Sequence, residues 1–342
     1  MRPAFLLSLV LTGICLLSLP VNAQNGAQTA TGSAPLLVVA NQGDKDISLV
    51  DTATEQPIAT IPEGVTAMHG HEAAASPDGR SAYVPIYSNV GVGHPGLNGH
   101  EMLVIDLPSR KIIGHVEFGH GVRPHCVIYN KHDGLLYVTT ELDQDVTLVD
   151  PRTLKIVGTI ATGQQQSHML AISPDGTRGY TANVGPGTVS VLDIKARKTL
   201  VVIPISGETQ RISVSNDNGM AFTSDQTQPR LAVIDTATNK VKAWVPLPGT
   251  GYGTAPTKDG RSLLVAIPSR NLVAVVDLAT LNVVNTILVP SAPQEILVRP
   301  DGRVAYVSCN VKNQVAVINL SDWKVQKLIN AGAGADGLAW AQ

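Results

Sequence analysis

Short runs of apolar and β-branched residues follow one another along the chain, and residues that favour turns separate them. One series consists of Gly179–Asn183, Thr188–Asp193 and Thr199–Ile203, and none of these runs has the 3.6-residue period of an amphipathic helix. The pattern therefore predicts successive short β-strands. The runs are almost continuously apolar, which indicates a sheet buried on both faces rather than one with a solvent-exposed face.

Two sequence markers show that these strands belong to a repeat of about 42 residues. The first marker is an Asp or Asn that follows two apolar residues. Its last two residues are Val50-Asp51, Ile105-Asp106, Val149-Asp150, Leu192-Asp193, Ile234-Asp235, Val276-Asp277 and Ile318-Asn319. The second marker is a turn that ends in glycine, found at Gly79, Gly134, Gly176, Gly219, Gly260 and Gly302. The two markers stay in phase along the chain, which chance would not produce.

A 42-residue repeat with four strands has the size of one blade of a β-propeller. Residues 36–342 accommodate seven such units, once an insertion at 88–100 in the second unit is set aside. The chain begins with a second strand, Leu36–Asn41, and ends with a first strand, Asp336–Ala341. We therefore expect an all-β, seven-bladed propeller with four-stranded antiparallel blades. The two terminal strands share one blade and close the ring.

Several repeats also carry a family resemblance. Tyr137-Val138-Thr139-Thr140, Tyr180-Thr181-Ala182-Asn183 and Tyr306-Val307-Ser308 resemble the motif of the YVTN-repeat β-propeller family, as does the run from Ala232 to Asn239. The resemblance covers the whole mature chain and implies the propeller fold. It implies little about function, because relatives of this family include binding proteins, lactonases, a lyase and a haem-carrying propeller.

The N-terminus has the residue order of a signal peptide. Arg2 precedes an apolar run from Ala4 to Leu19, and small residues lead to a cleavage site after Ala23. We therefore expect residues 1–23 to be removed, residues 24–35 to form a short linker, and the protein to be periplasmic or secreted. No later stretch approaches the roughly 20 apolar residues of a membrane helix. We expect a monomer without a transmembrane segment.

Composition excludes several classes of partner and cofactor. The net charge of -2 and the aromatic content of 4% give no basis for nucleic-acid binding. The glycines of the insertion are too irregular for a nucleotide-binding loop, so no nucleotide cofactor is expected. Cys126 and Cys309 are expected to be buried thiols, and without a Cys-x-x-Cys-His motif the chain cannot attach a c-type haem covalently.

The histidines suggest where a site lies. In each blade, the loop from the second to the third strand and the loop into the next blade emerge on one face, here called the top face. Counting back from the turn glycines places His71, His125 and His168 at the same position, at the top of the channel-lining strand of three consecutive blades. The equivalent residues of the other blades are Arg211, Tyr252, Gln294 and Asp336, with Glu72, Arg123 and Glu295 adjacent to ring positions.

Three imidazoles that converge on an axis suit a transition metal ion such as Zn or Cu. Glu72, Glu101 or Asp336 can orient a ring nitrogen or act as a general base. The insertion carries His94 and His100 and emerges on the same face, where it can cover the site as a lid. The alternatives are that these histidines bind only water and that the insertion is an ordinary surface loop.

Three functions remain open at this point. The first is binding of a transition metal or a small polar ligand through His71, His125 and His168, with Arg211, Tyr252, Gln294, Asp336, Glu72 and His100 as further ligand contacts. The second is a metal-assisted hydrolase or lyase, lactonase-like, that uses the same site. The third is a non-catalytic scaffold that binds another periplasmic protein.

Overall fold

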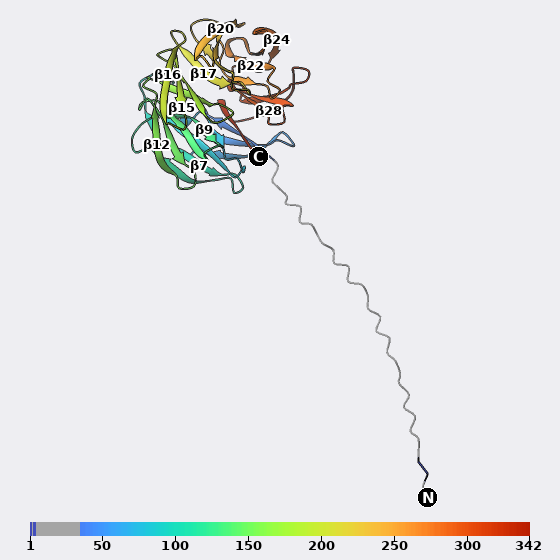
Figure 1. The fold of residues 1–342 in the computed structure, drawn as a ribbon. Coiled ribbons are helices and arrows are strands. Elements are labelled where there is room, and N and C mark those ends of the chain that lie inside the picture. Colours follow the sequence, from blue (N-terminus) through green and yellow to red (C-terminus); the bar gives the residue numbers. More distant parts are fainter. Residues whose placement is uncertain (2, 5–34) are drawn as a thin grey trace. The chain divides into compact units, whose positions relative to one another are not determined.

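The computed structural model describes residues 1, 3–4 and 35–342. From residue 35 onward the chain forms seven antiparallel sheets, the blades, which are arranged in a ring (Figure 1). The expected seven-bladed propeller is therefore confirmed. Nearly all of the expected signal peptide and linker lies outside the described residues. Among the described residues, no helix is long and apolar enough to cross a membrane.

Each blade has four strands, numbered outward from the central channel. The first strands are β29 (Ala335–Ala341), β4 (His69–Gly70) with β5 (Ala74–Ala75), β9 (Pro124–Asn130), β13 (Ser167–Ile172), β17 (Thr209–Val214), β21 (Thr254–Pro256) and β25 (Pro293–Val298). The second strands are β1 (Leu36–Asn41), β6 (Ser81–Ser88), β10 (Leu135–Thr140), β14 (Arg178–Asn183), β18 (Met220–Asp225), β22 (Ser262–Ile267) and β26 (Val304–Cys309).

The outer half of each blade completes the sheet. The third strands are β2 (Asp46–Asp51), β7 (Asn98–Asp106), β11 (Asp145–Asp150), β15 (Thr188–Asp193), β19 (Arg230–Asp235), β23 (Leu272–Asp277) and β27 (Gln314–Asn319). The fourth strands are β3 (Gln56–Pro62), β8 (Lys111–Glu117), β12 (Lys155–Ala161), β16 (Lys198–Pro204), β20 (Lys240–Pro246), β24 (Asn282–Leu288) and β28 (Lys324–Asn330). Two short 3-10 helices, η1 (Pro268–Arg270) and η2 (Asn310–Lys312), follow the second strands of the last two blades.

Burial explains the hydrophobic pattern of the strands. The second and third strands carry four or more successive buried residues, as in β14 and β15, because a neighbouring blade covers each of their faces. The fourth strands, such as β28, alternate exposed and half-buried positions because they form the outer rim. The core therefore lies between the blades.

The two ends of the chain meet in blade one. The C-terminal strand β29 pairs antiparallel with β1, with Leu36 opposite Ala341 and Val39 opposite Leu338. The expected sharing of one blade by both termini is thus confirmed, and β1 is paired on both of its edges. This closure also places Asp336 at the mouth, the top end of the central channel.

The recurring Asp residues shape the turns of the blades. In the turn after β2, Asp51 Oδ1 accepts hydrogen bonds from the backbone N–H groups of Ala53 and Thr54, at 2.8 and 3.0 Å. In the glycine turns on the opposite face from the mouth, Ser173 Oγ donates to Asp175 Oδ1 at 2.6 Å. These local hydrogen bonds explain why both markers recur with the period of the repeat.

Candidate functional site

The structure brings the three phased histidines together at the mouth. The ring centroids of His71 and His125 lie 5.2 Å apart, and those of His125 and His168 lie 3.5 Å apart with the rings stacked. A fourth imidazole, His69 in β4, lies 4.7 Å from His71. The side chains of His125 and His168 are almost completely buried, so the cluster lies below the surface of the top face.

Carboxylates contact two of these imidazoles at the Nδ1 atom. Asp336 Oδ2 lies 3.4 Å from His71 Nδ1, and Glu141 Oε2 lies 3.7 Å from His168 Nδ1. A carboxylate beside Nδ1 favours the proton on that nitrogen and leaves the Nε2 lone pair available. Asp336 thus lies on the Nδ1 side of the His71 ring.

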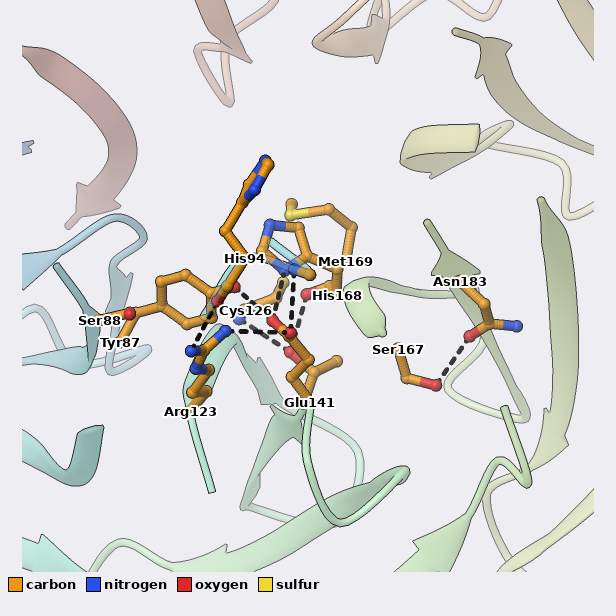
Figure 2. A network of polar contacts seen from close by, with 12 residues as sticks. Tyr87, Ser88, His94, Arg123, Cys126, Glu141, Ser167, His168, Met169 and Asn183 are labelled. Atoms are coloured by element: carbon orange, nitrogen blue, oxygen red, sulfur yellow. Dashed lines mark hydrogen bonds and ion pairs between the residues drawn. The ribbon is translucent and has the colours of Figure 1, made fainter. Parts of the chain in front are cut away.

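Glu141 connects the histidines to the rest of the mouth (Figure 2). The hydroxyl of Tyr87 donates a hydrogen bond to its carboxylate, and Arg123 Nη1 lies 3.6 Å from Oε1. The ring of Tyr87 packs edge-on against His71, His125 and His168, with centroid distances of 5.2, 4.9 and 5.4 Å. Glu141 therefore forms the polar wall of the site in blade three.

Arg211 reaches across the channel from blade five. Its Nη1 donates to Glu72 Oε1 at 2.5 Å and its Nη2 donates to Asp336 Oδ1 at 3.2 Å. The backbone of Arg211 has a φ of 57° inside an irregularity of β17, and Arg123 has a φ of 52°. A bulge of this kind redirects a side chain, and the strained backbone is held in place by the surrounding contacts.

Tyr252 and Gln294 occupy the far side of the mouth. The guanidinium carbon of Arg211 lies 4.9 Å from the centroid of the Tyr252 ring. The carbonyl of Gln294 accepts a hydrogen bond from Gly253 N at 3.1 Å. Next to it, Glu295 Oε2 accepts a hydrogen bond from Leu338 N at 2.7 Å and ties blade seven to β29.

The insertion folds against blades three and four. Gly93 N donates to Glu141 Oε1 at 3.3 Å, and Arg123 Nη2 donates to the carbonyl of His94 at 2.9 Å. Beneath it lies a cavity of about 500 Å³, lined by Gly93, His94, Pro95, Gly96, Asn98, Arg123, Glu141, Leu142, Gln144, Gln165 and Gln166. The cavity borders the histidine cluster through Glu141.

Two residues considered from the sequence lie apart from the cluster. His100 Nδ1 lies 3.2 Å from Glu117 Oε2, and both side chains are about half exposed. Glu101 contacts His115 Nδ1 at 2.7 Å, between the third and fourth strands of blade two. His100 and Glu101 are therefore each paired with a residue of the outer part of blade two and not with the histidine cluster.

Burial controls the protonation of the cluster. It lowers the pKa of His69 to about 4, and it lowers the pKa of His125 well below its ordinary value. The pKa of His168 is also lowered by burial, although Glu141 acts in the opposite direction. These three imidazoles are therefore neutral at pH 7, and each offers one acceptor nitrogen.

Burial also affects the carboxyl groups around Arg211. It raises the pKa of Glu72 well above its ordinary range, and it raises the pKa of Glu295, although Arg211 opposes both shifts. Burial acts in the same direction on Asp336, but the contacts with His71 and Arg211 outweigh it and the pKa of Asp336 is lowered. Glu72 and Glu295 contact each other, and burial favours the protonated form of both carboxyl groups.

The side chains do not form a ready metal centre. In the described part of the chain, no group of three or more His, Cys, Asp or Glu side chains is arranged to hold a metal ion. The lone pairs of imidazole lie in the ring plane, and the rings of His125 and His168 are stacked with an angle of 28° between their planes. Their nitrogens therefore do not converge on a common point.

Sequence reasoning missed His69, Tyr87 and Glu141 as parts of the site. Glu141 directly follows the second strand of its blade, as Gln42 does in blade one, and Gln42 Nε2 donates to Asp336 Oδ2 at 3.1 Å. This position thus supplies further contacts at the mouth from blades one and three. Aligning the residues that follow each second strand would have revealed a charged residue in blade three.

Comparisons with known proteins show similarity in fold. No family model matches the chain, and no curated protein matches its sequence. Hydrazine synthase from Kuenenia stuttgartiensis superposes with a TM-score of 0.71 at 20% identity, over 84% of this chain and 92% of that one. Dihydro-heme d1 dehydrogenase NirN, solved in complex with DHE, superposes with a TM-score of 0.63 at 19% identity, over 87% of this chain and 64% of that one. At these identities the likeness shows the fold alone, and the chain is a seven-bladed β-propeller.

Proposed function

We propose that the protein binds a small polar ligand at the mouth of the channel, above His71, His125 and His168. The observation that carries this proposal is a group of buried nitrogen atoms without hydrogen-bond partners. They are His69 Nδ1, His71 Nε2, His125 Nδ1 and Arg211 Nε. Buried polar atoms in native proteins almost always have partners, and four such atoms gathered at one end of a channel point to a ligand.

The surroundings of these atoms support the same proposal. The cavity of about 500 Å³ beside them has the size of a small-molecule site. Its polar lining from Arg123, Glu141 and the glutamines suits a ligand with hydrogen-bonding groups. The insertion at 88–100 acts as the lid, because Gly93 and His94 contact the wall of this cavity.

A single Zn or Cu ion is a second candidate, and the imidazole–carboxylate pairs favour it. His71 with Asp336 and His168 with Glu141 have the arrangement in which a carboxylate orients a metal-binding imidazole. In this candidate the Nε2 atoms of these two histidines would hold the ion. His125 would have to turn out of its stacking contact with His168 to become the third ligand.

The test is ligand-induced stabilisation of the untagged protein. A ligand at 100 times its Kd stabilises the folded form by about 2.7 kcal/mol, which raises the melting temperature by several degrees. Zn, Cu, haem and a panel of small polar compounds serve as probes, together with lactones and esters whose turnover would support the enzyme alternative. At least one probe should raise the melting temperature of wild type and not that of His71→Ala or His168→Ala. Equal shifts in all three proteins would place binding elsewhere.

Haem belongs among the probes because NirN was solved with DHE. The chain has no Cys-x-x-Cys-His motif, so the complex tested is a non-covalent one with an imidazole as axial ligand. A Soret band that is lost in His71→Ala or His168→Ala would identify the ligand as a haem. The periplasmic or secreted location and the YVTN-repeat membership remain part of this proposal.

A further inference from the structure

The glycine turn of blade three, which joins β9 to β10, is longer than the same turn in other blades. In blade four, Gly176 N donates to the carbonyl of Ser173 at 2.8 Å, and the turns of blades two, five, six and seven have the same three-residue span. In blade three, Gly134 N donates to the carbonyl of Asn130 at 2.9 Å, across four residues. His132 in this longer turn reaches blade four, where its Nε2 lies 2.9 Å from a backbone carbonyl oxygen. The groove between blades three and four is therefore built differently on the bottom face, the face opposite the mouth.

A cavity of about 750 Å³ lies in this groove. Its lining includes Asn130, Leu135, Tyr137, Ile194, Lys195 and Arg197. The groove between blades six and seven, where the turn is short, holds a cavity of about 290 Å³ that is lined in part by Trp323. Arg197 and Trp323 occupy the same position, directly before the fourth strand of their blades, with φ angles of 51° and 59°. Blade four therefore presents a guanidinium group where blade seven presents an indole ring.

Two of the basic side chains at this cavity have no carboxylate partner. Arg178, which also lines the cavity, is paired with Asp193 at 3.0 Å. In the part of the chain that the structure describes, neither Lys195 nor Arg197 forms an ion pair, and Arg197 Nη1 donates to the carbonyl of Val157 at 3.0 Å. The guanidinium of Arg197 thus keeps donors for a ligand, and its planar shape matches the paired oxygens of a carboxylate or a phosphate. Both side chains are charged throughout the neutral pH range.

The other walls of the cavity add a hydrogen-bond donor and apolar surface. The hydroxyl of Tyr137 donates to Asp133 Oδ2 at 2.6 Å and Leu135 N donates to Oδ1 at 3.0 Å, so this carboxylate already has donors. Asn130 Nδ2 is buried and forms no well-shaped hydrogen bond, although the Tyr137 hydroxyl lies near it. An amide NH₂ group carries two N–H donors, so at least one of them remains for an acceptor atom. Leu135 and Ile194 provide apolar surface.

We propose that this cavity is a second ligand site, which binds a small organic anion with a carboxylate or phosphate group on an apolar body. The acid group contacts Arg197 and Lys195, and the apolar body packs against Leu135 and Ile194. The volume of the cavity lies in the range of small-molecule sites. The site lies on the opposite face from the mouth and is independent of the function proposed there.

Isothermal titration calorimetry with four probes of similar size tests the proposal. Benzoate and phenyl phosphate carry the two acid groups, benzamide is neutral, and benzylamine is a cation. Arg197→Gln should weaken binding of the anions about tenfold or more, because it removes a charge-assisted hydrogen bond. The matched control is Arg110→Gln, since Arg110 has the same position in blade two, a φ of 57° and the same kind of bond, from Nη1 to the carbonyl of Ile58 at 3.2 Å. This variant should bind the anions as wild type does.

A second variant keeps the test decisive if Arg197→Gln does not fold. Lys195→Gln changes an exposed side chain without an ion pair, so it should fold as wild type does and still weaken anion binding. Binding of benzoate or phenyl phosphate that both variants weaken supports the proposal, and the tighter of the two probes identifies the acid group. Anion affinity equal in wild type and in the folded variants would overturn it. Benzamide or benzylamine bound as tightly as benzoate, or no binding of any probe, would overturn it as well.

Discussion

Arg211 in blade five is bound to Glu72 in blade two across the channel, with 2.5 Å between Nη1 and Oε1. The same guanidinium contacts Asp336 on the C-terminal strand, so one side chain joins three blades. Gly337 N and Leu338 N add hydrogen bonds from that strand to His71 O and Glu295. The channel mouth and the closure of the ring are therefore built from the same contacts.

Arg211→Ala should destabilise the fold strongly. Removing one partner of a buried ion pair leaves uncompensated charge, which costs about 3–5 kcal/mol. Urea unfolding should show this loss as a lower midpoint. Arg261→Ala is the control, because that side chain is largely exposed and its change should cost less than about 1 kcal/mol. Equal midpoints for Arg211→Ala and Arg261→Ala would contradict the role given to Arg211.

Gly337→Ala should separate the C-terminal strand from blade two. A Cβ at this position would lie 2.4 Å from the carbonyl oxygen of His71, a backbone atom that cannot move aside. We expect a loss of about 2 kcal/mol or more in the free energy of unfolding, together with weaker ligand binding. At Gly207 a Cβ would meet only the Thr227 methyl group at 3.3 Å, so Gly207→Ala should be tolerated. An unchanged Gly337→Ala protein would show that the close approach is not required.

Glu63→Gln should change the dependence of stability on pH. Burial raises the pKa of Glu63 to about 7, from an ordinary value of 4.5, and Gly70 N donates to both of its carboxyl oxygens. Between these two values the folded protein binds more protons than the unfolded chain. The contribution of Glu63 to stability is therefore complete below pH 4.5 and is lost as pH rises to about 7.

The difference between wild type and Glu63→Gln isolates this effect. His69, with its pKa lowered to about 4, acts with the opposite sign between pH 4 and 6.5, so the wild-type curve alone is not diagnostic. Between pH 4.5 and pH 8, the free energy of unfolding of the variant should rise by on the order of 2–3 kcal/mol relative to that of wild type. Urea unfolding across this range measures it. Parallel curves would show that Glu63 titrates normally.

Shortening the insertion should weaken ligand binding without unfolding the blade. Ser88 and Asn98 are paired at its base, so residues 89–97 can be replaced by an Asn-Gly turn. The change removes the hydrogen bond from Gly93 N to Glu141 and opens the cavity to solvent. We expect at least a tenfold loss of affinity, mainly through faster dissociation, and a change of less than about 1 kcal/mol in the free energy of unfolding. Unaltered dissociation would show that the insertion is an ordinary surface loop.

The sequence predicted the fold in detail because the repeat recurs in phase. Each Asp and Gly marker fixes a turn through local hydrogen bonds, so the strand order and the shared blade follow from counting. The position of His71, His125 and His168 follows from the same counting. The repeat also places Arg211 and Asp336 at the equivalent level of their blades.

The contacts across the channel could not be predicted in this way. The reach of Arg211 to Glu72 depends on an irregular backbone in β17, and the pairing of Glu141 with His168 depends on a loop side chain that turns inward. His125 and His168 were expected to converge on one metal ion, whereas their rings are stacked. Ring orientation depends on side-chain packing, which the spacing of residues does not determine.

Native mass spectrometry of the untagged protein, purified without denaturation, tests most directly whether the mouth holds a ligand. We predict that wild-type protein carries a bound species of defined mass and that the double variant His71→Ala, His168→Ala lacks it. The mass also distinguishes a metal ion, a small polar compound and a haem. A bound species retained by the double variant, or a wild-type protein that carries none and takes up none of the probes, would contradict the account.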